Sequence, residues 1–220
     1  MTCWAARLIP GLISLLIPIL LLALSLACVS GHPPEPAARL DPSGELVATE
    51  EIPGNFLMRQ QIDFRYGEQS GSFEAVVQKH CEELTVIGFT PFGTRAFSIR
   101  QRGIEVSVES HLPGGWPFSP RYVLLDIHRS YFVPISENPP HEGTREISRG
   151  GETILERWLA GRLAERSYQP GRGEPVGRIV VTYVGGTTTR APARRVQLHN
   201  ERYGYDLDVT TVYRAELTCP

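Results

Sequence analysis

Apolar and polar residues alternate with a period of two through most of the chain after residue 55, and this pattern constrains the fold more than any other feature. Such alternation is typical of β-strands that bury one face and expose the other. It predicts an antiparallel meander of strands, separated by turn residues, at residues 56–64, 72–79, 82–89, 94–100 and 103–110. A second block of strands is predicted at residues 177–184, 194–200 and 203–217. Together the blocks make a sheet of about eight strands that is split by an insertion.

The insertion, residues 111–176, carries the helical signals of the chain. Ser119 and Pro120 offer an N-cap and a first-turn proline to a helix over residues 121–132. The apolar residues of that segment fall on one helical face: Val123, Leu124, Ile127 and Tyr131.

A second helix is predicted from Thr153, with Glu156 as its capping-box partner. Its apolar stripe comprises Ile154, Leu155, Trp158, Leu159 and Leu163. The arginines opposite that stripe are interpreted as a solvated face: Arg157, Arg162 and Arg166. An antiparallel sheet must hide one face, and an insertion of this size can cover it. The predicted fold is therefore mainly β with α, an antiparallel half-barrel covered by a helical lid.

The amino terminus predicts export. Residues 8–27 are uncharged and almost wholly apolar, and Arg7 precedes them, which indicates a signal peptide at residues 1–27. A permanent membrane anchor is the alternative, since about twenty apolar residues can span a bilayer. The run ends in Ser25-Leu26-Ala27-Cys28, which resembles the lipobox of bacterial lipoproteins. This resemblance implies that Cys28 is acylated and becomes the first residue of the mature chain.

The segment that follows Cys28 is polar and contains several Pro, so residues 28–53 are predicted to form a lipidated flexible tether. The folded domain would then comprise residues 54–220. Val29 stands where an Asp commonly signals retention in the inner membrane. The resemblance to lipoproteins therefore implies the periplasmic face of the outer membrane.

Cysteine usage agrees with export. Cys3 would leave with the signal peptide and Cys28 would be modified, so that Cys81 and Cys219 remain as thiols in an oxidising compartment. The two could form a disulfide. Alternatively, Cys81 is a small buried hydrophobic residue and Cys219 an unpaired residue in a frayed tail.

Charge and motifs argue against several function classes. A formal net charge of -2, from 22 basic and 24 acidic residues, provides no overall field to hold nucleic acid. The familiar signatures of hydrolases, metalloproteases, redox dithiols and phosphate-binding loops are absent from the sequence. Five of the histidines share no ligand-like spacing and are interpreted as surface or turn residues: His80, His111, His128, His141 and His199. We therefore expect no catalytic residue, no cofactor and no metal site.

One connection departs from the usual chemistry of turns. Thr90-Pro91-Phe92-Gly93 joins two predicted strands and places a large aromatic at a hairpin tip, where polar residues are more common. Phe92 either folds back onto the sheet as a core residue or stays exposed for a membrane or partner to cover.

The segment LTVIGFTPFGTRAFSI, residues 84–99, resembles LolB, the outer-membrane receptor that accepts lipoproteins from the carrier LolA and inserts them. In LolB a hairpin protrudes and presents an exposed Leu, and Phe92 stands at that position between Pro91 and Gly93. Residues 117–134 and the closing strands at residues 178–209 are similar to an uncharacterised LolB-like lipoprotein family. Some members of that family are encoded beside aryl-polyene or fatty-acid-type biosynthesis genes.

This resemblance implies a LolA/LolB-like domain that binds acyl chains in an apolar cavity and receives or inserts lipidated cargo at the outer membrane. The cargo would be lipoproteins or a lipid-linked product, and a LolA-like periplasmic carrier would be a partner. Pro91, Phe92 and Gly93 would form the transfer hairpin. The candidate cavity residues are Phe97, Ile99, Val106 and Val108 on strands, with Leu124, Leu155 and Trp158 on the lid. The alternative functions are a non-transporting scaffold lipoprotein with a solid core and, third, an enzyme acting on lipids.

Overall fold

A computed structural model describes residues 44–111, 120–136, 138–173 and 175–219. These residues belong to one compact unit, Asp41–Pro220. The predicted signal peptide, Cys28 and most of the predicted tether lie outside the described residues. Within the described ranges, helices are too short or too polar to cross a bilayer.

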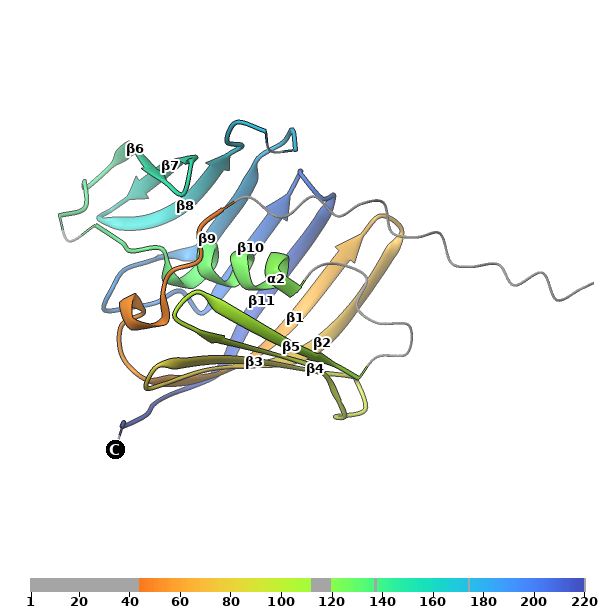
Figure 1. Ribbon diagram of the computed structural model, residues 1–220. Helices are drawn as coiled ribbons and strands as arrows, with labels where there is room; N and C mark the ends of the chain where they lie inside the picture. The colour runs from red at the N-terminus through yellow and green to blue at the C-terminus, as the bar shows by residue number, and fades with distance from the viewer. Residues whose placement is uncertain (1–43, 112–119, 137, 174, 220) are drawn as a thin grey trace, which may run out of the picture. The chain divides into compact units, whose positions relative to one another are not determined.

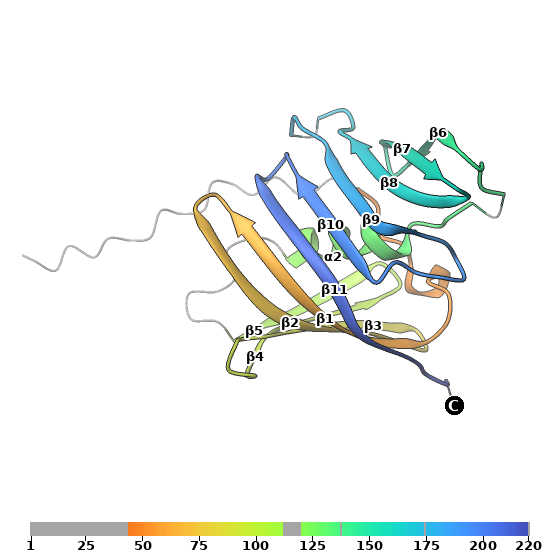
Figure 2. The same ribbon diagram turned by 180° about the vertical axis from the view of Figure 1, so that it is seen from behind.

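The unit is built on one sheet of eleven antiparallel strands in the order β5-β4-β3-β2-β1-β11-β10-β9-β8-β7-β6 (Figures 1 and 2). The first and last strands pair in the middle of the sheet, where Ile62 lies opposite Val209. The strands are β1 (Phe56–Tyr66), β2 (Gln69–His80), β3 (Glu83–Phe89), β4 (Arg95–Arg102), β5 (Glu105–Ser110), β6 (Gly143–Arg149), β7 (Glu152–Leu159), β8 (Arg162–Gln169), β9 (Ile179–Thr187), β10 (Arg195–Asn200) and β11 (Tyr205–Glu216).

The meander β1–β5 and the closing block β9–β11 confirm the strands that alternation predicts. The second predicted helix is wrong, because its residues form the hairpin β7–β8. Ile154 and Trp158 are four residues apart, a spacing that places two side chains on one face of a helix and equally on one face of a strand. Ala160 and Gly161, with φ of 49° and 70°, form the left-handed turn that joins the two strands. The insertion is therefore largely strand.

One helical segment is confirmed, and it lies across the inner face of the sheet (Figure 1). It consists of α2 (Pro120–Ile127) and a π-helical turn, η2 (His128–Phe132). The predicted lid of two helices is thus reduced to one short segment.

Two hydrophobic clusters pack beneath and beside this segment. The first joins α2 to β1–β4 through Leu124 and Leu125, which contact a group that includes Met58, Val77 and Ile99. The second lies on β7–β10 and centres on fully buried aromatic and aliphatic side chains, among them Trp158, Tyr168 and Val196.

The segment ahead of β1 belongs to the core. Residues 44–52, which include the short 3-10 helix η1 (Thr49–Glu51), form a strap whose apolar side chains Leu46, Val47 and Ile52 are buried in the first cluster. Residues 44–52, which the prediction assigns to the tether, therefore belong to the folded domain. Residues 28–53 are polar and contain several Pro, which is the composition of a flexible linker, so the burial of these three apolar residues was not predicted.

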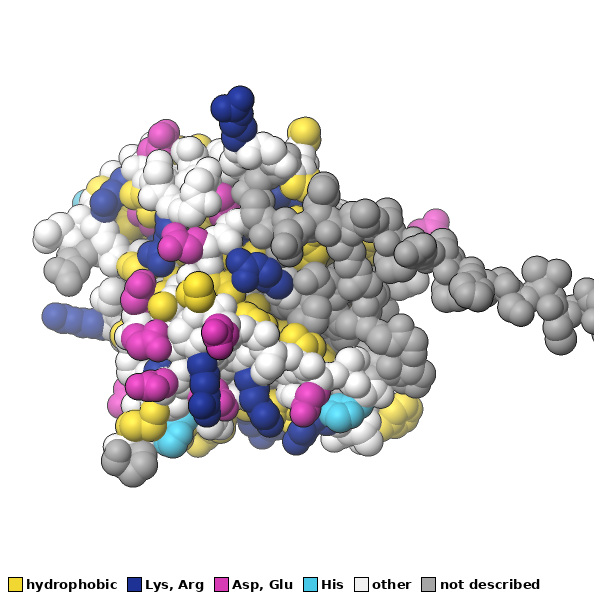
Figure 3. Space-filling model, viewed as in Figure 1, with side chains coloured by type: hydrophobic (Ala, Val, Ile, Leu, Met, Phe, Trp, Pro, Cys, Tyr) yellow, Lys and Arg dark blue, Asp and Glu magenta, His cyan; other side chains and the backbone are white. Residues whose placement is uncertain are grey.

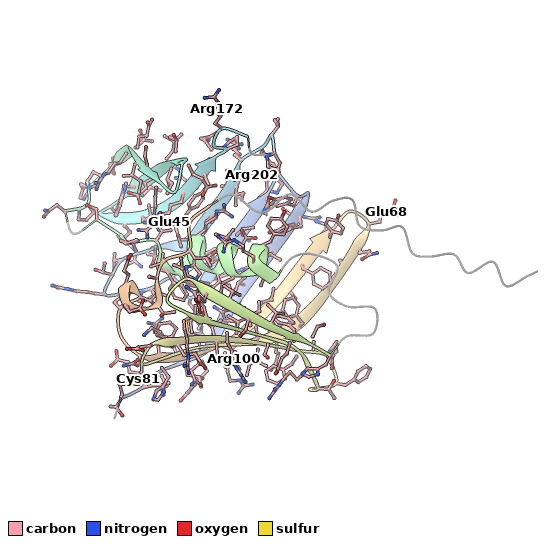
Figure 4. All side chains as sticks on the ribbon, viewed as in Figure 1. Glu45, Glu68, Cys81, Arg100, Arg172 and Arg202 are labelled. Carbon is pink, nitrogen blue, oxygen red and sulfur yellow. A yellow bond between two sulfur atoms is a disulfide. The ribbon has the colours of Figure 1, made fainter. Side chains whose placement is uncertain are left out.

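A disulfide joins Cys81 to Cys219, with 5.5 Å between the Cα atoms and 138 residues between the positions. It fastens the turn after β2 to the segment that follows β11. Figure 4 shows Cys81 and Glu68 at opposite ends of β2. The disulfide is therefore far from the β1–β2 turn.

Candidate functional site

The loop between β3 and β4 holds Phe92 in water. The amide N–H of Gly93 donates to the carbonyl of Thr90 at 2.9 Å, and that of Thr90 donates to the carbonyl of Thr94 at 2.8 Å. Pro91 and Gly93 occupy positions of the resulting turn that those residue types favour. Gly93 has a φ of 75°. The side chain of Phe92, at the remaining corner, is 92% exposed.

The strands beneath the loop fix its position. A β-bulge follows Gly88, where the pairing between β3 and β4 shifts by one residue. A Cβ atom at Gly88 would lie only 2.0 Å from the ring of Phe97, so the ring occupies the space of the missing side chain. Phe97 is thereby directed into the core while Phe92 is directed outward. Burying a Phe stabilises a fold by about 1.5–3 kcal/mol, and the fold does not gain this stabilisation at Phe92.

An open groove of about 570 Å³ adjoins the same loop. It lies on the outer face of the sheet, since Arg59, Gln61 and Val76 alternate with inner-face residues of β1 and β2. Its lining is Arg59, Gln61, Ser72, Phe73, Glu74, Val76, Phe89, Thr90, Pro91 and Gly93. The groove thus joins the middle of the sheet to the loop that carries Phe92.

Several charges on the exposed strands are paired with opposite charges. Arg59 lies 3.5 Å from Glu74, and Arg102 lies 3.0 Å from Glu83. Arg195 makes two hydrogen bonds to Asp208, at 2.8 and 2.6 Å. On the face shown in Figure 3, basic and acidic side chains stand side by side along the lower part of the molecule.

The predicted cavity residues divide between core and surface. Phe97, Ile99 and Leu124 are buried in the first cluster, and Val106 packs against it. Trp158 is buried in the second cluster. Val108 and Leu155 are exposed. Leu155 and Trp158 were expected on a helical lid, and both lie on β7 because the lid helix is a hairpin.

Between the helical segment and the sheet lies a small cavity. A cavity beside Leu125, His128 and Tyr168 has a volume of about 10 Å³. A volume of that size corresponds to about one water molecule. In the described part of the chain, the expected apolar cavity of several hundred Å³ is therefore not found at this position.

Buried ion pairs occupy part of this space, and sequence reasoning missed them. Arg129 of η2 lies 3.2 Å from Asp126 and 2.9 Å from Glu152, and Arg202 lies 2.7 Å from the same Glu152. Figure 4 labels Arg202, which follows β10. Burial raises the pKa of Asp126, while the charge of Arg129 acts in the opposite direction. These pairs bind the helical segment to the sheet.

Arg166 forms a further buried pair, with Glu156, at 2.8 Å, and both side chains are 1% exposed. It also donates to the carbonyls of Val133 and Pro134 at 2.7 and 2.8 Å. Its predicted place on a solvated face is wrong, because β8 turns this side chain inward. His128, expected at the surface, is also buried. The described residues contain no group of three His, Cys, Asp or Glu side chains suited to a metal ion.

Residues 57–213 match a family described as "Protein of unknown function (DUF3261)". The chain belongs to this family. Its match begins within β1 and ends within β11, so the DUF3261 match takes in residues of all eleven strands. A search of curated proteins finds no match to this member of the DUF3261 family.

Three solved structures are similar to this DUF3261 protein at low sequence identity. A LolA superfamily protein from Nitrosomonas europaea has 14% identity and a TM-score of 0.43, covering 79% of this chain and 91% of that one. A putative outer membrane lipoprotein-sorting protein domain from Vibrio parahaemolyticus has 11% identity and a TM-score of 0.42, covering 75% and 86%. A DUF1329 family protein from Desulfovibrio piger has 8% identity and a TM-score of 0.36, covering 76% and 87%.

Proposed function

We propose that this protein is a lipid-anchored protein of the periplasmic face of the outer membrane that contacts lipid through the β3–β4 loop. There it receives or inserts acylated cargo, either lipoproteins or a lipid-linked product, and a LolA-like carrier is the proposed donor. Cys28 is the proposed anchor. The proposed activity is non-enzymatic.

The exposure of Phe92 is the observation that carries this proposal. A hydrogen-bonded turn holds a large apolar side chain in water at a loop tip, where a membrane or a partner can cover it. The turn is closed by its own hydrogen bonds, so Phe92 is held outward without help from another part of the chain. An aromatic side chain at a loop tip can enter the interface of a bilayer at little cost in conformational entropy.

The small inner cavity changes where acyl chains would bind. We expect them at the loop and the outer groove, because the cavity beside Leu125, His128 and Tyr168 holds only about 10 Å³ while the groove holds about 570 Å³. The two buried hydrophobic clusters favour a second candidate function, a non-transporting scaffold of a periplasmic complex. For the scaffold, Phe92 would be covered by protein and not by lipid.

Photocrosslinking separates the two functions. Phe92 is replaced by the photoreactive p-benzoylphenylalanine in the full chain, expressed in cells, and the adducts are identified by mass spectrometry. Lipid transfer predicts adducts to phospholipid or acylated cargo. The matched control is the same replacement at Val176, which is 93% exposed but lies outside the loop. Adducts to a non-acylated protein alone, or equal lipid adducts at both positions, would contradict the proposal.

A further inference from the structure

β6 is the last strand at one edge of the sheet (Figure 1). An edge strand presents backbone N–H and C=O groups that pair with no neighbouring strand, and these groups can bind a further strand. The other edge strand, β5, leads directly into residues 112–119, which lie outside the described residues. β6 is therefore the edge whose flanking segments the structure describes.

The turn that follows β6 fixes which of its backbone groups face away from β7. Gly150 and Gly151 have φ of 57° and 78°, the geometry of a two-residue type I′ turn. The residues that flank such a turn, Arg149 and Glu152, form a hydrogen-bonded pair, and non-hydrogen-bonded and hydrogen-bonded pairs then alternate along the two strands. Three residues of β6 therefore direct their N–H and C=O groups to the open side: Thr144, Glu146 and Ser148.

The open side of β6 is accessible. Thr144, Glu146 and Ser148 are all exposed, and no other described segment hydrogen-bonds to their backbone groups. An extended polypeptide presents its own N–H and C=O groups with the same repeat, so it can satisfy all three residues together. The chemistry of this edge is therefore that of a site for an extended peptide segment.

Charges on β6 act against a second copy of this chain as the occupant. Two antiparallel copies of β6 centred on residue 145, 146 or 147 place like charges directly opposite one another: Arg145 on itself, Glu146 on itself, or Arg145 on Arg149. Like charges in such positions are destabilising. The occupant is therefore a different polypeptide.

The inner face of β6 carries the side chains that select this polypeptide. Ile147 packs against the second cluster and is only partly buried, and Arg145, two residues away on the same face, is exposed. Arg145 lies opposite Glu156, but that carboxylate is hydrogen-bonded to Arg166 at 2.8 and 3.0 Å. No carboxylate of the described residues lies within 4.0 Å of the Arg145 guanidinium. An acidic residue of a partner can therefore pair with it.

The strand on the paired side of β6 shows the sequence pattern that suits this face. Ile154 of β7 lies opposite Ile147, and Glu156 lies opposite Arg145. A strand added on the open side meets the same two side chains, since neighbouring strands share their faces. We infer that β6 binds an extended segment of a partner protein, antiparallel to it, in which an apolar residue is followed two positions later by Asp or Glu. Neither lipid nor Phe92 takes part in this interaction, so it is independent of the proposed function.

The test measures binding of a labelled synthetic peptide to the full chain in detergent. The peptide has the sequence of residues 152–159, which carries the required pattern. Fluorescence anisotropy gives the affinity, and hydrogen exchange resolved to single residues gives the site. We expect the amides of Thr144, Glu146 and Ser148 to exchange at least about tenfold more slowly in the complex, because they become hydrogen-bonded.

Two variants test the backbone and the charge separately. Glu146→Pro removes an open-side N–H that does not bond to β7, which an edge strand tolerates, and should weaken binding at least about tenfold. Arg145→Glu should weaken binding about two- to tenfold, and a peptide with Glu156→Lys should restore it. The control is Arg100→Glu, which reverses an exposed arginine on β4, labelled in Figure 4, and should leave binding unchanged. Thermal unfolding checks that each variant is folded.

Several results would overturn the inference. Failure of the peptide to bind, or binding that leaves the three amides exchanging as in the free chain, would show that the edge is not a peptide site. Equal binding of a peptide with both Ile154→Lys and Glu156→Lys would show that the inner face does not select the partner. Self-association of the full chain that Glu146→Pro abolishes would assign the edge to a second copy.

Discussion

His128 and Gln101 together form hydrogen bonds to both backbone polar groups of Val47, a residue of the strap. Nε2 of His128 lies 2.8 Å from Oε1 of Gln101, and Nδ1 of His128 accepts from the N–H of Val47 at 2.9 Å. Nε2 of Gln101 donates to the carbonyl of Val47 at 2.8 Å. Because Nδ1 is an acceptor here, His128 must be neutral in the folded protein.

This arrangement predicts acid sensitivity. Burial, with the nearby charges of Arg149 and Arg121, lowers the pKa of His128 to about 3, from 6.5. Below pH 6.5 the unfolded chain binds a proton that the folded chain does not, so the free energy of unfolding falls between pH 6.5 and pH 3 by up to about 1.4 kcal/mol per pH unit. Urea unfolding at pH 7, 6, 5 and 4 measures this slope. The variant His128→Gln should be less stable at pH 7 but have a shallower slope, and parallel slopes would contradict the assignment.

The β7–β8 hairpin offers a comparison of two ion pairs on its opposite faces. Glu156→Gln leaves the buried charge of Arg166 uncompensated and should lower the free energy of unfolding by about 3–5 kcal/mol. Glu165→Gln removes the exposed partner of Arg157 and should lower it by about 1 kcal/mol or less. Denaturant unfolding of the two variants measures both values. Equal losses would show that Arg166 is not desolvated as the structure indicates.

Because Cys81 and Cys219 form a disulfide, neither should be detected as a free thiol. In a chain with Cys3 and Cys28 replaced by Ser, a thiol reagent should find no reactive group after denaturation without reductant. Reduction should lower the free energy of unfolding by up to about 4–5 kcal/mol in the chain-entropy account, since the closed loop is long. Two reactive thiols before reduction would contradict the bridge.

Cys28 is the proposed site of acylation. Cells competent for lipoprotein processing should incorporate labelled palmitate into the wild-type chain and not into Cys28→Ala. The variant Cys3→Ala is the control, because its lipobox is intact. Continued labelling of Cys28→Ala would assign the modification to another residue.

Phe92→Glu should separate stability from function. Because Phe92 is exposed, the free energy of unfolding should change by no more than about 0.5 kcal/mol. Membrane contact of the loop should weaken, since a carboxylate is costly to place among acyl chains. The contact is measured by flotation of the protein with vesicles. All chains carry Cys28→Ala, so that the lipid anchor does not hold them to the vesicles, and Val176→Glu is the control for Phe92→Glu. A loss of several kcal/mol in stability would instead show that Phe92 packs inward.

Most of the sheet was predictable because its strands alternate strictly and end in turn residues. The β7–β8 hairpin was missed because Ile154 and Trp158 fit both periodicities. A further signal was present: oppositely charged residues are placed symmetrically about Gly161, so that Glu156 faces Arg166 and Arg157 faces Glu165. Cross-strand charge pairs of this kind favour a hairpin.

The candidate site was predictable in part. Phe92 could be located at a hairpin tip because the flanking strands and the Pro91–Gly93 turn are local in sequence. The groove depends on how β1, β2 and β3 are aligned and on the bulge after Gly88, neither of which local sequence reveals. The burial of Arg166 also depends on tertiary context. An Arg on a strand is expected at the surface unless a buried partner, here Glu156 on the neighbouring strand, is known.

The pairing of β1 with β11 has a consequence for how the chain acquires its structure. Ile62 and Val209 meet in the middle of the sheet although nearly the whole domain separates them in sequence. The two halves of the sheet therefore cannot be joined until the last strand has been synthesised. Domains dominated by such distant contacts fold in milliseconds to seconds, about a thousand times more slowly than small helical bundles. A long-lived unpaired edge on β1 is thus inherent in this topology, and the folding chain must be kept from associating through it until β11 arrives.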